Sequence, residues 1–146
     1  MKAESKLSAS QPVTANSSVT HTQVVDCKGF ARAVFNVWNT TPATTNIPAV
    51  LKISEGDTTS AYTDIDEFTA GTGFTAAAMT TATSTTNAYR LDVDLRGKKR
   101  YQKLTYTMPA GQATTVVTVS SACELYRASQ GLETAAKQGV NQLIQG

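Results

Sequence analysis

The feature that most constrains this chain is a two-residue alternation of apolar and polar side chains, which recurs from Val19 to Tyr126. Successive side chains of a strand point to opposite faces, so this period indicates strands with one buried and one solvated face. Leu104, Tyr106 and Met108, for example, share one face of their segment. The composition agrees, because β-branched Thr, together with Val and Ala, fills positions where helical proteins carry Leu, Glu and Lys. The sequence predicts an all-β domain.

The strands are short and are separated by turn residues. We expect roughly seven or eight of them, with turns at the spacing that is typical of a β-sandwich. The expected strands cover segments 19–25, 30–38, 50–54, 61–65, 89–95, 101–107 and 114–126. This pattern favours an antiparallel β-sandwich, jelly-roll-like or Ig-like, with a closed barrel as the alternative. The stretch from 68 to 86 is rich in Thr and contains two glycines, and we expect it to be a long surface loop.

The two ends of the chain differ from its centre. Residues 1–12 are polar and lack periodicity, which predicts an extended N-terminal arm, and residues 13–127 form the β-sandwich domain. Residues 128–146 predict a short C-terminal helix, or helical arm, from apolar side chains at helical spacing: Leu132, Ala135, Ala136, Val140, Leu143 and Ile144. An isolated helix of this length is marginal in water. We therefore expect both arms to become ordered on a neighbouring subunit or another partner surface.

Charge and hydropathy exclude several classes of partner. The net charge is only +2 and 16% of the residues are charged, whereas a dedicated nucleic-acid binder carries a larger basic excess. No apolar run approaches the ~20 residues that cross a bilayer, and we expect no signal peptide. We therefore predict neither a nucleic-acid nor a membrane partner. Without export, Cys27 and Cys123 are expected to be reduced, apolar fillers, with a disulfide between them as the alternative.

Catalytic chemistry has little support in this sequence. His21 is the only histidine, and its alternating, Thr-rich segment predicts an exposed or half-buried strand residue rather than a catalytic base. We predict no enzyme, no cofactor and no metal. A calcium site in the acidic loop around Glu55 and Asp57 is the alternative, although its spacing is not that of an EF-hand. Trp38 has two interpretations, a core residue, which we favour, or an exposed interface anchor.

One basic cluster lies in the second half of the chain, in a turn that leads into a predicted strand. Its members are Arg96, Lys98, Lys99, Arg100 and Lys103. The first interpretation is a solvated turn whose charges protect a strand edge from aggregation. The second is electrostatic complementarity to an acidic partner surface, where charge sets register and association rate more than affinity.

Three motifs, taken in order, resemble a diffuse group of small tailed-bacteriophage head proteins. That group has a strand opening with "DLxGY", a middle "LQESDDGxxFTDV" and a late "GxKRYLRVxVT". The corresponding segments here are VDCKGF at 25–30, VLKISEGD at 50–57 with YTDI at 62–65, and GKKRYQKLTYT at 97–107. The similarity spans roughly residues 24 to 126, so it covers the predicted sandwich and not the arms.

The resemblance implies a virion protein, made in the host cytoplasm, that binds the outer surface of an assembled capsid as a decoration or cement protein. The implied partners are the major capsid protein and neighbouring copies on the lattice, including a homo-oligomer. We expect the contacts to come from Arg96, Lys98, Lys99, Arg100, Lys103, Leu132, Val140, Leu143 and Ile144. The alternatives are a receptor- or carbohydrate-binding module on a virion surface, or a head-completion or tail-tube subunit.

Overall fold

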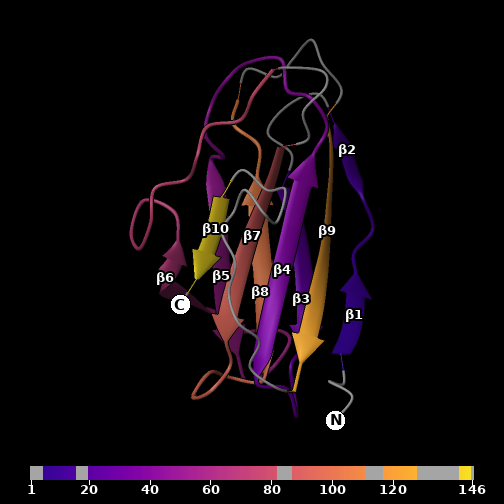
Figure 1. The fold of residues 1–146 in the computed structure, drawn as a ribbon, viewed down its shortest axis with the longest axis vertical. Coiled ribbons are helices and arrows are strands. Elements are labelled where there is room, and N and C mark those ends of the chain that lie inside the picture. The colour runs from indigo at the N-terminus through magenta and orange to yellow at the C-terminus, as the bar shows by residue number, and fades with distance from the viewer. Residues whose placement is uncertain (1–4, 16–19, 82–86, 111–116, 128–141, 146) are drawn as a thin grey trace.

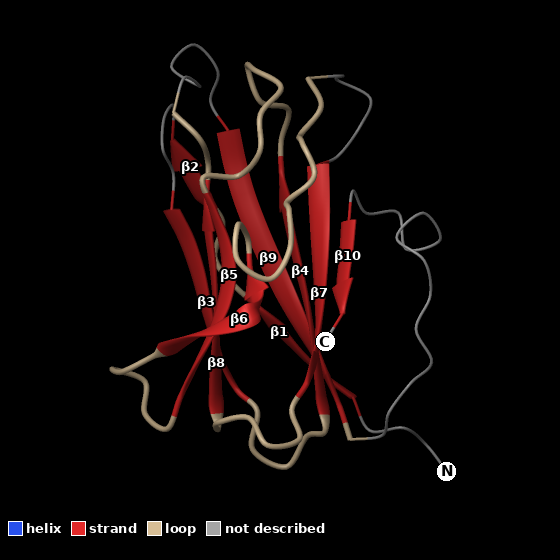
Figure 2. Cartoon of the chain, turned by 90° about the vertical axis from the view of Figure 1, so that its left-hand side faces the viewer, coloured by secondary structure: helices blue, strands red, loops and turns tan. Residues whose placement is uncertain are grey.

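A computed structural model describes residues 5–15, 20–81, 87–110, 117–127 and 142–145, and these residues form strands, turns and loops without a helix (Figures 1 and 2). The strands are β1 (Ser5–Ala9), β2 (Val13–Ala15), β3 (Thr20–Asp26), β4 (Arg32–Asn39), β5 (Val50–Gly56), β6 (Thr63–Thr69), β7 (Asn87–Asp94), β8 (Tyr101–Thr107), β9 (Val117–Tyr126) and β10 (Gln142–Gln145). The predicted all-β class is confirmed for this part of the chain.

The strands form two sheets that pack against each other, seen as two layers in Figure 2. One six-stranded sheet has the order β1-β9-β4-β7-β10, with β2 also paired to β9. The four-stranded sheet has the order β3-β8-β5-β6. Neighbours are antiparallel except β10, which runs parallel to β7. The predicted β-sandwich is therefore confirmed.

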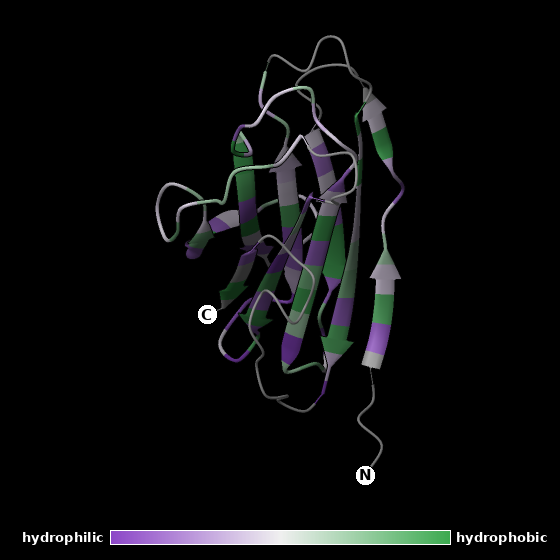
Figure 3. Ribbon diagram, turned by 45° about the horizontal axis from the view of Figure 1, so that its top comes forward, coloured by the Kyte–Doolittle hydropathy of each residue, from purple (hydrophilic) through white to green (hydrophobic). Residues whose placement is uncertain are grey.

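The core lies between the two sheets and follows the predicted alternation. Leu104 and Tyr106 of β8 are fully buried, and β9 buries every second residue, among them Val119 and Cys123. Figure 3 shows the same alternation as bands of apolar and polar colour along the strands. Two adjacent residues of such a strand therefore face different environments, one the apolar core and the other the outer face of the sheet.

The C-terminal segment corrects one prediction. The predicted helical arm covers 128–146, of which 128–141 lie outside the described residues. Gln142–Gln145 is the strand β10, paired in parallel with β7, so the helix prediction is wrong there. Ile144 is only 5% exposed and belongs to the core cluster. A short helix is marginal by itself, whereas the edge of β7 offers backbone hydrogen bonds and the core offers burial.

The N-terminal residues also differ from the prediction of an extended arm over 1–12. Ser5–Ala9 forms β1 and pairs with β9 of the same chain, and β2 pairs with β9 immediately beyond it. Leu7 remains 66% exposed, so β1 is attached chiefly through its backbone. Backbone pairing needs no apolar face, which is why a polar, aperiodic segment forms a strand here.

Individual residues in the first half of the chain correct two further expectations. Trp38 is 36% exposed, on the face of β4 that points away from the core, so it is not a core residue. His21 of β3 is buried inside the sandwich, whereas an exposed or half-buried strand residue was expected.

The predicted loop from 68 to 86 begins later than expected. Phe68 and Thr69 end β6, and the described residues that follow form turns and loops up to residue 81.

Within the described ranges, no helix is long and apolar enough to cross a membrane.

Candidate functional site

Three turns lie together at one end of the sandwich and carry most of the predicted basic contact residues. The register aligns Asp26 at the end of β3, Tyr101 at the start of β8 and Gly56 at the end of β5. We call this region, residues 26–31, 55–62 and 94–100, the charged end; it is the lower end in Figure 1. The backbone of Gly97 has a positive φ of 77°, a conformation that glycine adopts readily, so a tight turn carries the basic residues into β8.

Arg100 makes the most regular ion pair of the charged end. Its Nη2 lies 2.6 Å from Asp26 Oδ2 and its Nε lies 3.0 Å from Asp26 Oδ1. This is a bidentate contact, which suits the planar guanidinium group. The backbone N–H of Lys28 also donates to Asp26 Oδ1, at 3.1 Å. These hydrogen bonds, that of Arg100 first, lower the pKa of the Asp26 carboxyl to about 2. The contact joins the turn after β3 to the start of β8.

The two lysines of the same turn contact other acidic segments. Lys99 Nζ lies 3.5 Å from Asp57 Oδ2, and the Lys99 backbone N–H donates to Glu55 Oε2 at 2.9 Å. Lys98 Nζ donates to Glu67 Oε1 of β6 at 2.8 Å. The basic turn is therefore bound to the turn after β5 and to β6.

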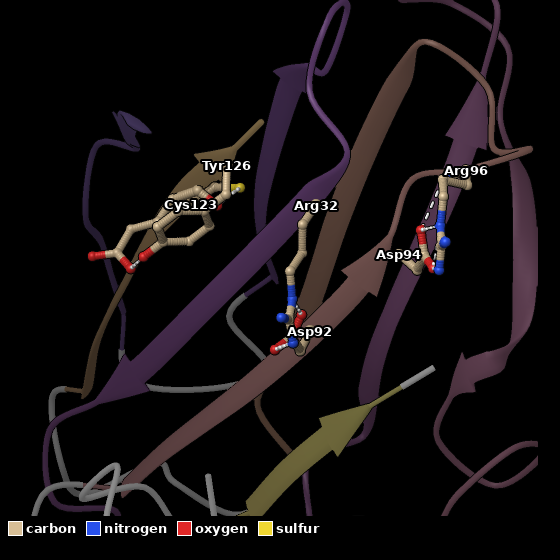
Figure 4. Close-up of polar contacts among 7 residues, drawn as sticks. Arg32, Asp92, Asp94, Arg96, Cys123 and Tyr126 are labelled. Carbon is tan, nitrogen blue, oxygen red and sulfur yellow. Dashed lines mark hydrogen bonds and ion pairs between the residues drawn. The ribbon is translucent and has the colours of Figure 1, made fainter. Parts of the chain in front are cut away.

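The remaining members of the basic cluster also have partners. The Arg96 guanidinium is hydrogen-bonded to Asp94, as Figure 4 shows, and it lowers the pKa of that carboxyl to about 2. The Arg96 side chain nevertheless stays 82% exposed. Lys103 Nζ lies 4.5 Å from the centre of the Tyr62 ring, within the range of a cation–π contact.

The structure thus brings the five predicted basic residues close to the charged end but gives each of them an intramolecular partner. The surface presents paired charges of both signs instead of a bare positive patch. Of the predicted apolar contact residues, Ile144 lies in the core and Leu143 is in the edge strand β10. Leu132 and Val140 lie outside the described residues.

The proposed calcium ligands are engaged with the same turn. Glu55 accepts the Lys99 backbone N–H and Asp57 lies beside the Lys99 ammonium group, so a cation here would displace an existing one. Among the described residues there is no group of three or more His, Cys, Asp or Glu side chains that could hold a metal ion.

A second charged feature, which the sequence analysis missed, lies on the face of the six-stranded sheet that points away from the core. Arg32 of β4 and Asp92 of β7 are both buried there and face each other as an ion pair (Figure 4). Burial raises the pKa of the Asp92 carboxyl, and Arg32 opposes that increase. The signal in the sequence was that both residues take polar positions of predicted strands, but only the register of β4 on β7 brings them together.

The other feature that the sequence did not predict is a buried hydrogen bond between Ser121 and His21. Its direction, from donor to acceptor, does not suit nucleophilic catalysis. Ser121 Oγ donates to the amide oxygen of Gln23 at 2.6 Å, so its proton is already used. His21 Nε2, 2.8 Å from the same Oγ, must therefore be the donor. A catalytic histidine accepts the serine proton at this nitrogen instead. All three side chains are buried, which also separates them from any substrate in solution.

No family model, no curated protein and no solved structure matches this chain.

Proposed function

We propose that this protein is a non-enzymatic virion protein that binds the outer surface of an assembled phage capsid and stabilises it. Its partners in this proposal are the major capsid protein and neighbouring copies on the lattice. The observation that carries the proposal is the arrangement of the segments that resemble phage head proteins. They occupy the end of β3 and its turn, β5, the start of β6, and β8 with the turn that leads into it, which are neighbours in the four-stranded sheet. The segments that carry the resemblance therefore lie side by side in the fold.

We also propose a jelly roll as the finer description of the fold. With β1 and β2 counted as one interrupted strand, four of the antiparallel pairs are β1 with β9, β3 with β8, β4 with β7, and β5 with β6. These are the pairs of a single long hairpin, and they alternate between the two sheets as they do when such a hairpin is rolled up. Jelly rolls occur in viral capsid proteins and lectins, which supports a virion protein without identifying its role.

In this proposal the charged end is the surface that meets the shell. Its paired charges supply a fixed pattern of donors and acceptors, which suits recognition of a patterned partner and sets orientation more than affinity. Arg96 is the side chain best placed to exchange its partner, because it is largely exposed. A protein that binds only the intact shell stabilises the shell by its binding free energy.

The test is binding of the purified protein to capsids that lack it, followed by heating of the particles. We expect saturable binding and a higher temperature of capsid disruption. Arg96→Glu is expected to weaken binding at least tenfold, whereas the matched charge reversal Lys52→Glu, in the middle of β5, leaves it nearly unchanged. If the wild-type protein binds no capsid, the proposal is wrong; if both reversals act equally, the charged end is not the contact surface.

A carbohydrate- or receptor-binding module is the second candidate, because Trp38 is partly exposed on a sheet face. Its cross-strand neighbours are Ala88 of β7 and Ser120 of β9, and both have small side chains that leave much of the indole uncovered. Exposed aromatic rings are suitable platforms for sugar rings. A glycan array separates the candidates: binding that is lost in Trp38→Ala favours this module, and the absence of any glycan signal leaves the capsid-binding proposal preferred.

A further inference from the structure

A buried chain of hydrogen bonds joins the two sheets and continues to the N-terminal strand. His21 Nε2 donates to Ser121 Oγ, which donates to Gln23 Oε1. The amide nitrogen of Gln23 in turn donates to the backbone carbonyl of Ser8 at 2.7 Å. The cluster therefore connects β3 of one sheet with β9 and β1 of the other. We call these four residues the relay.

One atom of the relay, His21 Nδ1, has no hydrogen-bond partner among the described residues. His21 is 1% exposed, and its Nδ1 is buried without a hydrogen bond. Because Nε2 carries the proton in this arrangement, Nδ1 is an unprotonated nitrogen, which tolerates burial as a neutral atom. Adding a proton there would create a charged ring with a buried N–H donor that lacks an acceptor, and an unpaired buried charge is strongly unfavourable.

The strands packed against β3 offer no negative charge to balance a protonated His21. On the core face, β8 presents Tyr106 and β9 presents Cys123, and burial raises the pKa of both, so they stay neutral. The other titratable side chains of these two strands, Tyr101, Lys103, Glu124 and Tyr126, alternate with the core residues and point to the outer faces. In β1, Lys6 acts on Asp26 at the charged end.

The element that can open to expose His21 is β1. Its residues Lys6, Leu7 and Ala9 are exposed, and it pairs with β9 along one edge. Beyond that pairing, Gln23 binds Ser8, and Ser10 Oγ donates to the Thr22 carbonyl at 3.4 Å. Pro12, which has no backbone N–H, separates β1 from β2 and interrupts the pairing. Detaching β1 would bring water to the relay without opening the centre of the core.

We infer that β1 is a pH-controlled strand: protonation of His21 opens the relay and detaches β1 from β9, while the rest of the sandwich stays folded. Burial lowers the pKa of His21 below its ordinary 6.5, so the closed form holds a neutral ring and the open, solvated form takes up a proton. The opening equilibrium constant should then rise about tenfold per pH unit from 6.5 down to the lowered pKa. This inference does not depend on the proposed function.

The test is amide hydrogen exchange of the full chain between pH 8 and pH 5, corrected for intrinsic exchange rates, together with NMR titration of the imidazole. His21 is the only histidine, so its signal is unambiguous. We expect the amides of β1 to lose protection below pH 6.5 while those of β4 and β8 keep theirs. Constant protection of β1 across the His21 titration, or simultaneous loss in all three strands, would overturn the inference.

Two variants distinguish the effect of protonating His21 from the effect of the hydrogen bonds of the relay. His21→Gln keeps an amide donor for Ser121 but does not titrate, so the protection of β1, relative to the intrinsic exchange rates, should not change with pH. Gln23→Met removes the bond to Ser8, so β1 should exchange faster at every pH, with β4 and β8 unchanged. If His21→Gln does not fold, the wild-type titration and Gln23→Met still decide; wild-type exchange rates in Gln23→Met would contradict the relay.

Discussion

At the scale of single residues, adjacent positions of one strand differ sharply in what they tolerate. Leu104 is fully buried between the sheets, whereas Thr105 lies on the other face of β8 and is only partly buried. A carboxylate at the first position would be charged, buried and unpaired, which costs several kcal/mol; at the second it reaches water. The total stability of such a domain is typically about 5–15 kcal/mol.

We therefore predict that Leu104→Asp unfolds the domain at neutral pH and that Thr105→Asp does not. Chemical denaturation followed by tryptophan fluorescence measures both. Lys99→Ala, which removes an exposed ion pair, should change the free energy of unfolding by less than about 1 kcal/mol. A normal transition in Leu104→Asp would mean that the assignment of the two faces is inverted.

The Asp26–Arg100 pair predicts how the charged end responds to acid. The folded protein holds the pKa of Asp26 at about 2, below its ordinary 3.8, so the unfolded chain binds the proton more readily. The stabilisation is complete above pH 3.8 and is lost as the pH falls from 3.8 towards 2. In Arg100→Gln, NMR titration should find the Asp26 pKa shifted back towards 3.8. An unchanged value would show that Arg100 is not its main cause.

At the scale of elements, the sequence predicted strands that have a local side-chain pattern. It did not predict strands that form only by pairing with the edge of a distant strand. The strands β3, β4, β5, β7, β8 and β9 overlap the segments predicted from period-two patterns. The strand β6 runs to Thr69, beyond the predicted segment 61–65, and its buried residues Ile65 and Phe68 do not alternate. The strands β1 and β10 were not predicted, because they join the edges of β9 and β7 through backbone groups that no side-chain pattern reveals. The spacing of Leu143 and Ile144 from earlier apolar residues suited a helix, but the open edge of β7 gives these residues a strand conformation.

The strand β10 can be tested through its one described core residue. Ile144 is buried with the core, so Ile144→Ala should destabilise the protein by about 2–5 kcal/mol through lost burial and the cavity left behind. The matched variant Ile47→Ala changes an isoleucine that is exposed, and should have little effect. Urea denaturation compares the two. Equal stabilities would mean that β10 does not contribute to the core.

At the scale of the whole molecule, the basic cluster was predictable but its neutralisation was not. The cations lie in one stretch of sequence, whereas their partners Asp26, Asp57 and Glu67 come from three other segments. Only the pairing of the strands in the two sheets gathers them at one end. The relay has the same origin: His21 and Ser121 are 100 positions apart, and no local pattern connects them. Contacts of this kind require the topology, which short motifs do not encode.

The central claim is that this protein belongs to the outer shell of a virion, and the copy number in purified particles tests it most directly. The proposal implies a phage that encodes the chain, and quantitative mass spectrometry of its gradient-purified full particles measures the ratio of the chain to the major capsid protein. A decoration protein should be present in many copies, at a fixed ratio set by the lattice. Absence from the particles would contradict the account, and a few copies per particle would favour a head-completion subunit instead.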